Sequence, residues 1–242
     1  MSTSQETTRW RASGSYLLRL ASKTSLLEET RQFLQIYARL RSIEATRQAL
    51  INGGLPQRSR ATRQTILEIV QIRLVRWNPP AWVLDDLVVF AQDGHQNELQ
   101  AALLLHSARQ DNLLYNIIQQ VVVPRWLEGE CELIRADIQR FLDAVQSIHP
   151  EIAGWSYSTR ERLSSHALAT LRDFGLLQGI RSKQIIEPIV PQIVVQHLIR
   201  LLCEEGIAEE DLAHHPDWQL WLWDTGQAQK AIDGVLLQEH NV

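Results

Sequence analysis

Hydrophobic residues recur along most of the chain with the spacing of an α-helix, and few stretches alternate with the period of a β-strand. The spacing predicts helices at about 26–40, 42–51, 60–76, 81–92, 96–108 and 111–123. Three more are predicted at about 132–145, 158–174 and 191–204. The chain is therefore expected to be mainly α-helical.

Local signals place several ends of these helices. Ser25 is a candidate N-cap for the first helix, and Asn52-Gly53-Gly54 is a C-terminal stop because glycine adopts the left-handed conformation without strain. The helix at 60–76 is apolar on most sides in its middle, which predicts a central, buried position. Asn78-Pro79-Pro80 ends that helix and is a candidate boundary.

The region after about residue 132 has a different order of elements. Ser158 and Glu161 have the spacing of a capping box at the start of the predicted helix 158–174. Gly175 is a natural C-terminal cap for the same helix. The stretch "LLQGIRSKQIIEPIV" then predicts a short β-hairpin with a Gly/Arg/Ser/Lys tip. Helix, turn, helix and hairpin is the order of a winged helix-turn-helix.

The predicted fold is accordingly mainly α, with two helical units that each contain a helix-turn-helix-like element, the second a winged helix with a short β-hairpin. The helix starts "SRATR" at 59–63 and "SYSTR" at 156–160 match when offset by 97 residues, which raises the possibility of two related units. We divide the chain into an N-terminal helical domain at 1–127, a winged-helix-like domain at 128–205 and an acidic tail containing tryptophans at 206–242.

Charge is distributed unevenly although the net charge is only −4. Residues 1–77 contain 13 Arg and Lys against 5 Asp and Glu, a surplus of eight positive charges. Residues 78–242 contain 11 against 23, a surplus of twelve negative charges. A basic part beside an acidic part is typical of nucleic-acid binding, and pairing of the two parts within the molecule is the alternative explanation.

Three arginines, Arg58, Arg60 and Arg63, surround the predicted start of the helix at 60–76. A helix N-terminus carries partial positive charge, so each cation there costs roughly 0.3 to 1 kcal/mol unless an anion is bound. A DNA phosphate would satisfy both the arginines and the exposed N–H groups, and a carboxylate from the acidic half of the chain is the alternative.

The second unit carries its own cations on the predicted recognition helix and wing. Glu161 and Asp173 dilute this patch, so a protein contact is an equal alternative there. The predicted nucleic-acid-binding residues of both units are Arg9, Arg11, Arg58, Ser59, Arg60, Arg63, Ser158, Thr159, Arg160, Arg162, Arg181 and Lys183.

The sequence contains no phosphate-binding glycine loop, nucleophile elbow, zinc-protease motif or paired-cysteine motif, which favours a protein without enzymatic activity, cofactor, metal or small-molecule substrate. His214 and His215 are weak metal-ligand candidates and are expected to be solvent-exposed, whereas His166 and His197 are expected to pack within helices. Trp218, Trp221 and Trp223 are expected to cover the core or contact a protein.

Neither an apolar run long enough to cross a membrane nor a signal peptide is evident, and the first residues, "MSTSQETTRW", are expected to form a polar arm. Only two cysteines, Cys131 and Cys203, are present and they are widely separated, which suits a reducing compartment. We therefore expect a cytoplasmic protein with no membrane partner.

Three blocks, "TRWRASGSYLLRL", "NGGLPQRSRATRQTILEIVQIRL" and "YSTRERLSSHALATLRDFGLL", together resemble the BrxA family of BREX bacteriophage-exclusion systems. The resemblance covers roughly residues 8–205, and none of its blocks is a catalytic signature. It implies an all-helical, cytoplasmic, non-enzymatic component of bacterial defence that binds DNA. A likeness to helical RNA-binding antitermination factors is a competing implication.

We therefore expect a protein that binds double-stranded DNA mainly through phosphate contacts from its N-terminal arginines, with any sequence preference supplied by the second unit. Two alternatives stay open. The first is an antitermination-like helical factor that binds RNA. The second is a scaffold that bridges other BREX proteins through the acidic tail.

Overall fold

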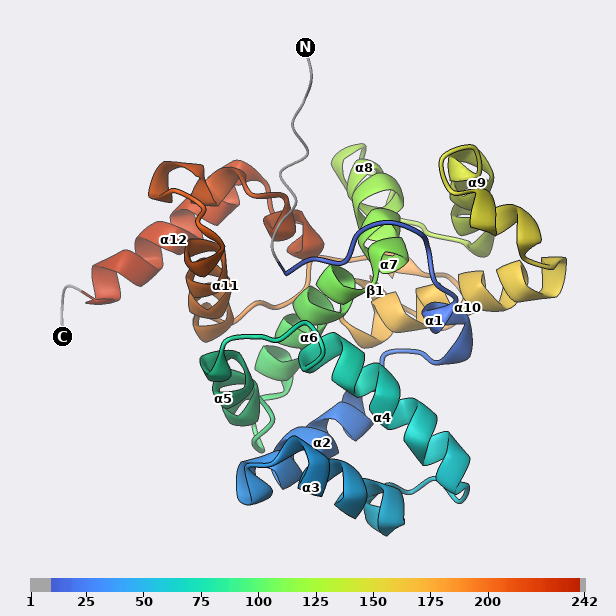
Figure 1. The fold of residues 1–242 in the computed structure, drawn as a ribbon. Coiled ribbons are helices and arrows are strands. Elements are labelled where there is room, and N and C mark those ends of the chain that lie inside the picture. The colour runs from blue at the N-terminus through green and yellow to red at the C-terminus, as the bar shows by residue number, and fades with distance from the viewer. Residues whose placement is uncertain (1–9, 240–242) are drawn as a thin grey trace.

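The computed structural model describes residues 10–239, and within them the predicted mainly helical fold is confirmed (Figure 1). The α-helices are α1 (Arg19–Ser22), α2 (Leu27–Leu40), α3 (Ile43–Ala49), α4 (Arg60–Leu74), α5 (Ala81–Phe90), α6 (Gln96–Gln110), α7 (Asn112–Ile117), α8 (Val123–Leu127), α9 (Arg135–Val145), α10 (Tyr157–Asp173), α11 (Gln192–Glu205) and α12 (Thr225–Glu239). Two π-helical turns, η1 (Leu50–Gly54) and η2 (Ile118–Val122), extend α3 and join α7 to α8. Three 3₁₀ turns follow at η3 (Pro150–Gly154), η4 (Glu209–His214) and η5 (Pro216–Trp221).

The predicted β-hairpin is also present. Strands β1 (Leu177–Gln178) and β2 (Gln184–Ile185) pair in antiparallel register, with Leu177 opposite Ile185. An isolated bridge between Glu132 and Gln184 adds a third short segment to this sheet. Because residues around Glu132 pair with the hairpin, the helix predicted from 132 begins only at Arg135.

Two predicted N-caps are wrong. Ser25 does not cap α2, because Leu26 occupies that position in the left-handed conformation and the Ser25 hydroxyl donates instead to Asp173 Oδ2 at 2.8 Å. Ser158 does not cap α10 either, since that helix begins two residues earlier, after Ser156. At α2 the tertiary contact with Asp173 outweighs the local capping signal. At α10 the hydroxyl of Ser156 caps the helix in place of Ser158.

The helix at the centre of the molecule is α6. The sequence predicts a central, buried position for α4, and this is only partly right. Nearly every residue of α6 from Leu99 to Gln110 is buried, and it packs against α4, α5, α7, α11 and η5. The second half of α4 is buried as expected, but its first turns expose Arg60, Gln64 and Glu68. Figure 1 shows α6 in the middle, with α11 and α12 on one side and α9 and α10 on the other.

The start of the described chain lies across this centre as an extended strap, residues 10–18. The Ala12 N–H donates to the Arg109 carbonyl at 2.7 Å, and Asn112 donates to the Gly14 carbonyl at 2.7 Å. Further along, the Tyr16 N–H donates to Glu151 Oε1 at 2.5 Å. The strap therefore connects α6, α7 and η3 before it leads into α1, which packs on α10.

An ion cluster buried at the centre links the strap, α6, α11 and the C-terminal segment. The Arg109 guanidinium donates to both Glu205 and Asp217, and all three side chains are at most 1% exposed. Tyr115 donates to Asp217 Oδ1 at 3.1 Å, and the Trp10 N–H donates to Glu205 Oε1 at 3.1 Å. Burial opposes ionisation of Asp217, but the charges of Arg109, His215 and Arg11 lower its pKa below the ordinary value.

The C-terminal segment, residues 206–239, is part of the folded core. Trp218 and Trp221 are fully buried, and the Trp221 indole donates to the Ala101 carbonyl of α6 at 3.2 Å. The buried hydrophobic residues from Tyr16 to Val235 form one continuous cluster. The expectation that these tryptophans cover the core therefore agrees with their positions.

A second buried polar chain crosses from the surface to the centre through two histidines. His197 Nδ1 lies 2.7 Å from Asp86 Oδ2, and His197 Nε2 lies 2.9 Å from His106 Nε2. Because the carboxylate can only accept, neutral His197 donates from Nδ1 and accepts at Nε2. His106 then donates from Nε2 and keeps an unpartnered lone pair on its buried Nδ1. Burial is the main cause that lowers the pKa of both imidazoles, that of His106 well below 6.5.

We predict that Asp217→Asn lowers the free energy of unfolding by about 3 to 5 kcal/mol, because it leaves the Arg109 charge buried with one counter-charge removed. Urea denaturation followed by tryptophan fluorescence measures this change. The matched control Asp211→Asn removes an exposed carboxylate and is expected to change stability by less than about 0.5 kcal/mol. Equal stabilities for the two variants would contradict the central role of the cluster.

We also predict that acid destabilises the fold through the buried histidines. Below the ordinary pKa of 6.5 the unfolded chain binds protons that folded His106 excludes, so stability falls as the pH falls. Between about pH 7.5 and pH 5.5 His106 alone accounts for a loss of about 1.4 kcal/mol. Urea denaturation at both pH values is expected to show this loss in the wild type and a smaller loss in His106→Gln. The exposed-residue control His214→Gln keeps the wild-type pH dependence.

Candidate nucleic-acid interface

The start of α4 is built by Ser59 and Arg63. The Ser59 hydroxyl accepts the Thr62 N–H at 3.4 Å, as an N-cap does. Arg63 turns back from the helix and donates to the carbonyls of Ile51 at 2.8 Å, Gln57 at 2.5 Å and Arg58 at 3.2 Å. Ile51 belongs to η1, where the last carbonyls of a helix lack partners within it. The Nε and Nη1 donors of Arg63 are therefore engaged by the preceding segment.

Arg58 and Arg60 differ from Arg63. Both are exposed, and neither side chain forms an ion pair or hydrogen bond within residues 10–239. The acidic half of the chain does not neutralise them there. At this helix start, the guanidinium groups of Arg58 and Arg60 are thus available for an external anion.

Two predicted nucleic-acid contacts, Arg9 and Arg11, lie near the beginning of the chain. Arg9 lies outside the described residues. Arg11 donates to the Tyr115 hydroxyl at 2.8 Å, lies over the Tyr115 ring at 4.5 Å and is 3.8 Å from Asp217 Oδ1. Arg11 therefore belongs to the central ion cluster, and its Nη1 is used inside the molecule.

The start of α10 repeats the design of α4 with Ser156 as the N-cap. Its hydroxyl accepts the Thr159 N–H at 3.2 Å, in the same way that Ser59 accepts from Thr62. The offset that matches "SRATR" with "SYSTR" aligns these two caps, so it identified the correct serine even though the capping box did not. Ser158 is exposed and Thr159 half-buried, and both hydroxyls lie within 3.1 Å of the Ser156 hydroxyl.

The arginines of α10 are only partly available. Arg160 pairs with Asp143 of α9, so it ties the helix start to the preceding element as Arg63 does. Glu161 is held by Arg135 at 3.3 Å and by Gln139. Arg162 is exposed, and no acid or hydrogen-bond acceptor engages its side chain in the described part of the chain. Arg162 is therefore the cation that α10 presents to solvent near its start.

Two further predicted nucleic-acid contacts, Arg181 and Lys183, lie in the hairpin. The Lys183 ammonium donates to the Gly179 carbonyl at 2.7 Å, which closes the loop between the strands. Arg181 is exposed at the tip, with no ion pair or hydrogen bond to its side chain among residues 10–239. The Leu133 N–H donates to the Lys183 carbonyl at 2.9 Å, and the Ile185 N–H donates to the Cys131 carbonyl at 2.6 Å. The hairpin is therefore fixed against the segment that joins α8 to α9.

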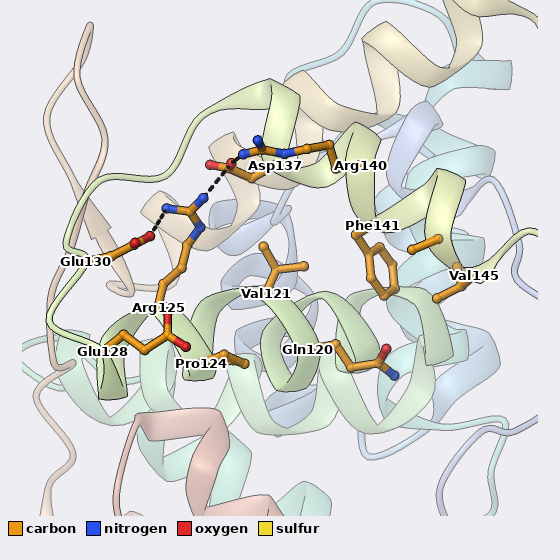
Figure 2. A pocket seen from close by; sticks show the side chains of 11 residues that line it. Gln120, Val121, Pro124, Arg125, Glu128, Glu130, Asp137, Arg140, Phe141 and Val145 are labelled. Atoms are coloured by element: carbon orange, nitrogen blue, oxygen red, sulfur yellow. Dashed lines mark hydrogen bonds and ion pairs between the residues drawn. The ribbon is translucent and has the colours of Figure 1, made fainter.

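A groove of about 520 Å³ between α8 and α9 also contains arginines, but acids compensate them (Figure 2). Arg125 donates to Glu130 at 2.8 Å and to Asp137 at 2.7 Å, and Asp137 also accepts from Arg140. Glu128 lines the same groove. This arrangement stabilises the start of α9, where Asp137 accepts the Ile134 N–H at 2.8 Å, and it is a poor site for a phosphate.

The described residues contain no group of three or more His, Cys, Asp or Glu side chains placed to hold a metal ion. His214 is exposed, as expected, but His215 is half-buried, since its Nδ1 accepts the Asp217 N–H at 3.2 Å. His197 is buried as predicted, and His166 Nδ1 lies 3.0 Å from the Leu20 carbonyl of α1. Within residues 10–239 no helix combines the length and apolar content needed to span a membrane.

The interface residues thus fall into two groups that different parts of the fold contribute. One is Arg58 and Arg60 at the start of α4, at the lower right of Figure 1. The other is Arg162 of α10 and Arg181 of the hairpin. Figure 1 shows the start of α10 at the right edge, apart from the start of α4. Sequence reasoning listed all four, but the same sequence signal also selected Arg11, Arg63 and Arg160, which the fold uses internally.

Comparison with solved structures shows the same fold elsewhere. An uncharacterized protein from Magnetospirillum magneticum, known from its crystal structure, is similar with a TM-score of 0.64 at 17% sequence identity. The match covers 79% of this chain and 96% of that one. No curated protein matches the sequence.

Comparison with family models identifies the chain's relatives more directly. The BrxA family model matches residues 14–201, which is well over half of the 242-residue chain. This range includes the second half of the strap from residue 14, the starts of α4 and α10 and the hairpin. The chain therefore belongs to the BrxA family, and this membership implies a role in BREX bacteriophage defence.

Proposed function

We propose that this BrxA-family protein is a non-enzymatic component of its BREX system that binds duplex DNA through α9, α10 and the hairpin. The observation that carries the proposal is the arrangement of these elements. Helix α8, the short pairing segment at Glu132, helices α9 and α10, and strands β1 and β2 follow one another, and Glu132 pairs with β2. A helix, a strand, two helices and a two-stranded wing in this order, with the first strand paired to the last, make a winged helix.

Docking of such a unit follows from its shape. The second helix of a helix-turn-helix enters the major groove, and its N-terminal residues contact base edges and phosphates. At the start of α10 the exposed residues are Tyr157, Ser158 and Arg162, which supply an aromatic ring, a hydroxyl and a guanidinium. No acid among residues 10–239 pairs with Arg162, and a guanidinium binds a phosphate or a guanine edge with two hydrogen bonds.

The start of α4 is proposed as a second phosphate contact. Arg58 and Arg60 extend from a capped helix start, which favours anions, and neither side chain has a partner among the described residues. Arg63 is not included, because the carbonyls of the preceding segment occupy its donors. The four proposed DNA contacts are therefore Arg58, Arg60, Arg162 and Arg181.

Bridging through the tryptophans of the tail is not favoured as the function. That idea requires Trp218 and Trp221 on the surface, and both are fully buried against the core. Trp223 is half-buried, and its indole donates to Glu187 Oε1 at 3.0 Å. Other surfaces remain available for BREX partner proteins.

We predict that Arg162→Ala with Arg181→Ala, and separately Arg58→Ala with Arg60→Ala, lowers the affinity for duplex DNA and flattens its salt dependence. Each lost phosphate contact is expected to reduce the slope of log affinity against log salt by about 0.9. A fluorescence-anisotropy titration of a labelled duplex at several salt concentrations measures both quantities. Arg39→Ala, which removes an exposed cation of α2, is the matched control and is expected to leave both unchanged.

Competition by unlabelled duplex DNA, single-stranded DNA and structured RNA in the same titration distinguishes the nucleic-acid classes. The proposal expects duplex DNA to compete best. Stronger competition by structured RNA would support the antitermination-like alternative instead. Unaltered titrations for both double variants would remove the assignment of these arginines, and thermal melts confirm that the variants remain folded.

A further inference from the structure

The tip of the hairpin exposes an apolar side chain where the fold has no use for one. Ile180 is 86% exposed, the highest value for a large hydrophobic side chain among residues 10–239. It lies beside Arg181 in the loop that joins β1 to β2. Hairpin loops favour Gly, Asn, Asp and Ser, since these residues fit the turn and remain hydrated. An exposed β-branched residue in such a loop adds nothing to the stability of the hairpin.

The residues around Ile180 hold the tip in one conformation. Gly179 has φ +93°, and a Cβ placed there would lie 2.2 Å from the Ser182 carbonyl oxygen, so the loop closes too tightly for any other residue. The Lys183 ammonium donates to the Gly179 carbonyl at 2.7 Å. The Ser182 hydroxyl donates to Glu132 Oε1 at 2.8 Å and accepts from Gln184 Nε2 at 2.9 Å.

These contacts engage Ser182 and Lys183 and leave Ile180 and Arg181 exposed to solvent. The backbone of the loop is held on both sides of the tip, which presents one aliphatic and one guanidinium side chain to solvent. A loop backbone that is already held loses less conformational entropy on binding than an unconstrained one.

We infer that Ile180 is an apolar contact that enters the DNA minor groove beside the major groove occupied by α10, with Arg181 next to it. This inference rests on the proposed function. The minor groove is about 6 Å wide, so it excludes a helix but admits side chains from a narrow loop. Its walls are sugar rings that suit an aliphatic side chain, and its negative potential attracts an arginine.

Acidic side chains also lie near the tip. Glu132 is exposed and accepts a hydrogen bond from Ser182, whereas Glu130 is paired with Arg125. Ile180 and Arg181 are the tip residues that these contacts leave available for a groove contact.

The test compares Ile180→Ser, Arg181→Ala and the control Ile189→Ser in titrations of a short duplex with an A·T-rich centre. Ile189 is 70% exposed and follows β2 in the same unit, away from the tip. Ile180→Ser is expected to weaken binding roughly ten-fold, the effect of losing one buried aliphatic side chain, with the salt slope unchanged. Arg181→Ala is expected to weaken binding and to flatten the slope, and Ile189→Ser is expected to behave as the wild type.

Netropsin, which occupies the A·T minor groove, provides an independent measurement. It is expected to weaken binding of the wild type strongly and to weaken binding of Ile180→Ser much less. If Ile180→Ser binds as tightly as the wild type while Arg162→Ala loses affinity, the groove contact is wrong and the proposed DNA binding stands. If the wild type does not bind duplex DNA at all, both are wrong.

Discussion

The buried guanidinium of Arg109 is the interaction on which the rest of the structure depends. It lies in the central helix and is neutralised by Glu205 at the end of α11 and by Asp217 in the C-terminal segment. An arginine without water around it must find carboxylates, because an unpaired buried charge costs several kcal/mol. The positions of α11, η5 and the strap are therefore coupled, and Trp10 and Tyr115 complete the cluster with hydrogen bonds to the same two carboxylates.

This coupling explains how an acidic C-terminal segment belongs to a protein with a basic N-terminal region. The acids that matter most for the fold are buried beside Arg109, and three others pair with cations three, one and four residues away. Within residues 10–239 the acidic half does not pair with Arg58, Arg60, Arg162 or Arg181. These cations are few, but among the described residues none has a counter-charge, which is the property that an anion-binding surface needs.

The helix starts of α4 and α10 show how closely structural and functional arginines resemble each other in sequence. Arg63 and Arg160 occupy the same place after a capping serine, and each fixes its helix to the element before it, one through carbonyls and the other through a carboxylate. Arg60 and Arg162 stand only three and two residues away, and they face solvent. Composition and spacing cannot separate these roles, because the acceptors lie in other segments. The same limit applies to Ile180, whose exposure follows from the tight closure at Gly179.

The sequence by itself determined the helical class, most helix ranges and the hairpin, because periodicity and glycine stops act within a few residues. The resemblance of three separate sequence blocks indicated the family. Even so, the local signal selected the wrong serine as the N-cap of α10, where Ser156 accepts the Thr159 N–H. It also missed that Ser25 donates to Asp173 of a distant helix and does not cap α2. Tertiary structure alone decided that α6 is the centre, that Asp217 belongs to the core and that Arg63 is engaged while Arg58 is not. These outcomes depend on which groups meet after folding, across 12 residues for Arg63 and Ile51 and 108 for Arg109 and Asp217, and the spacing of residue types carries no information about such contacts.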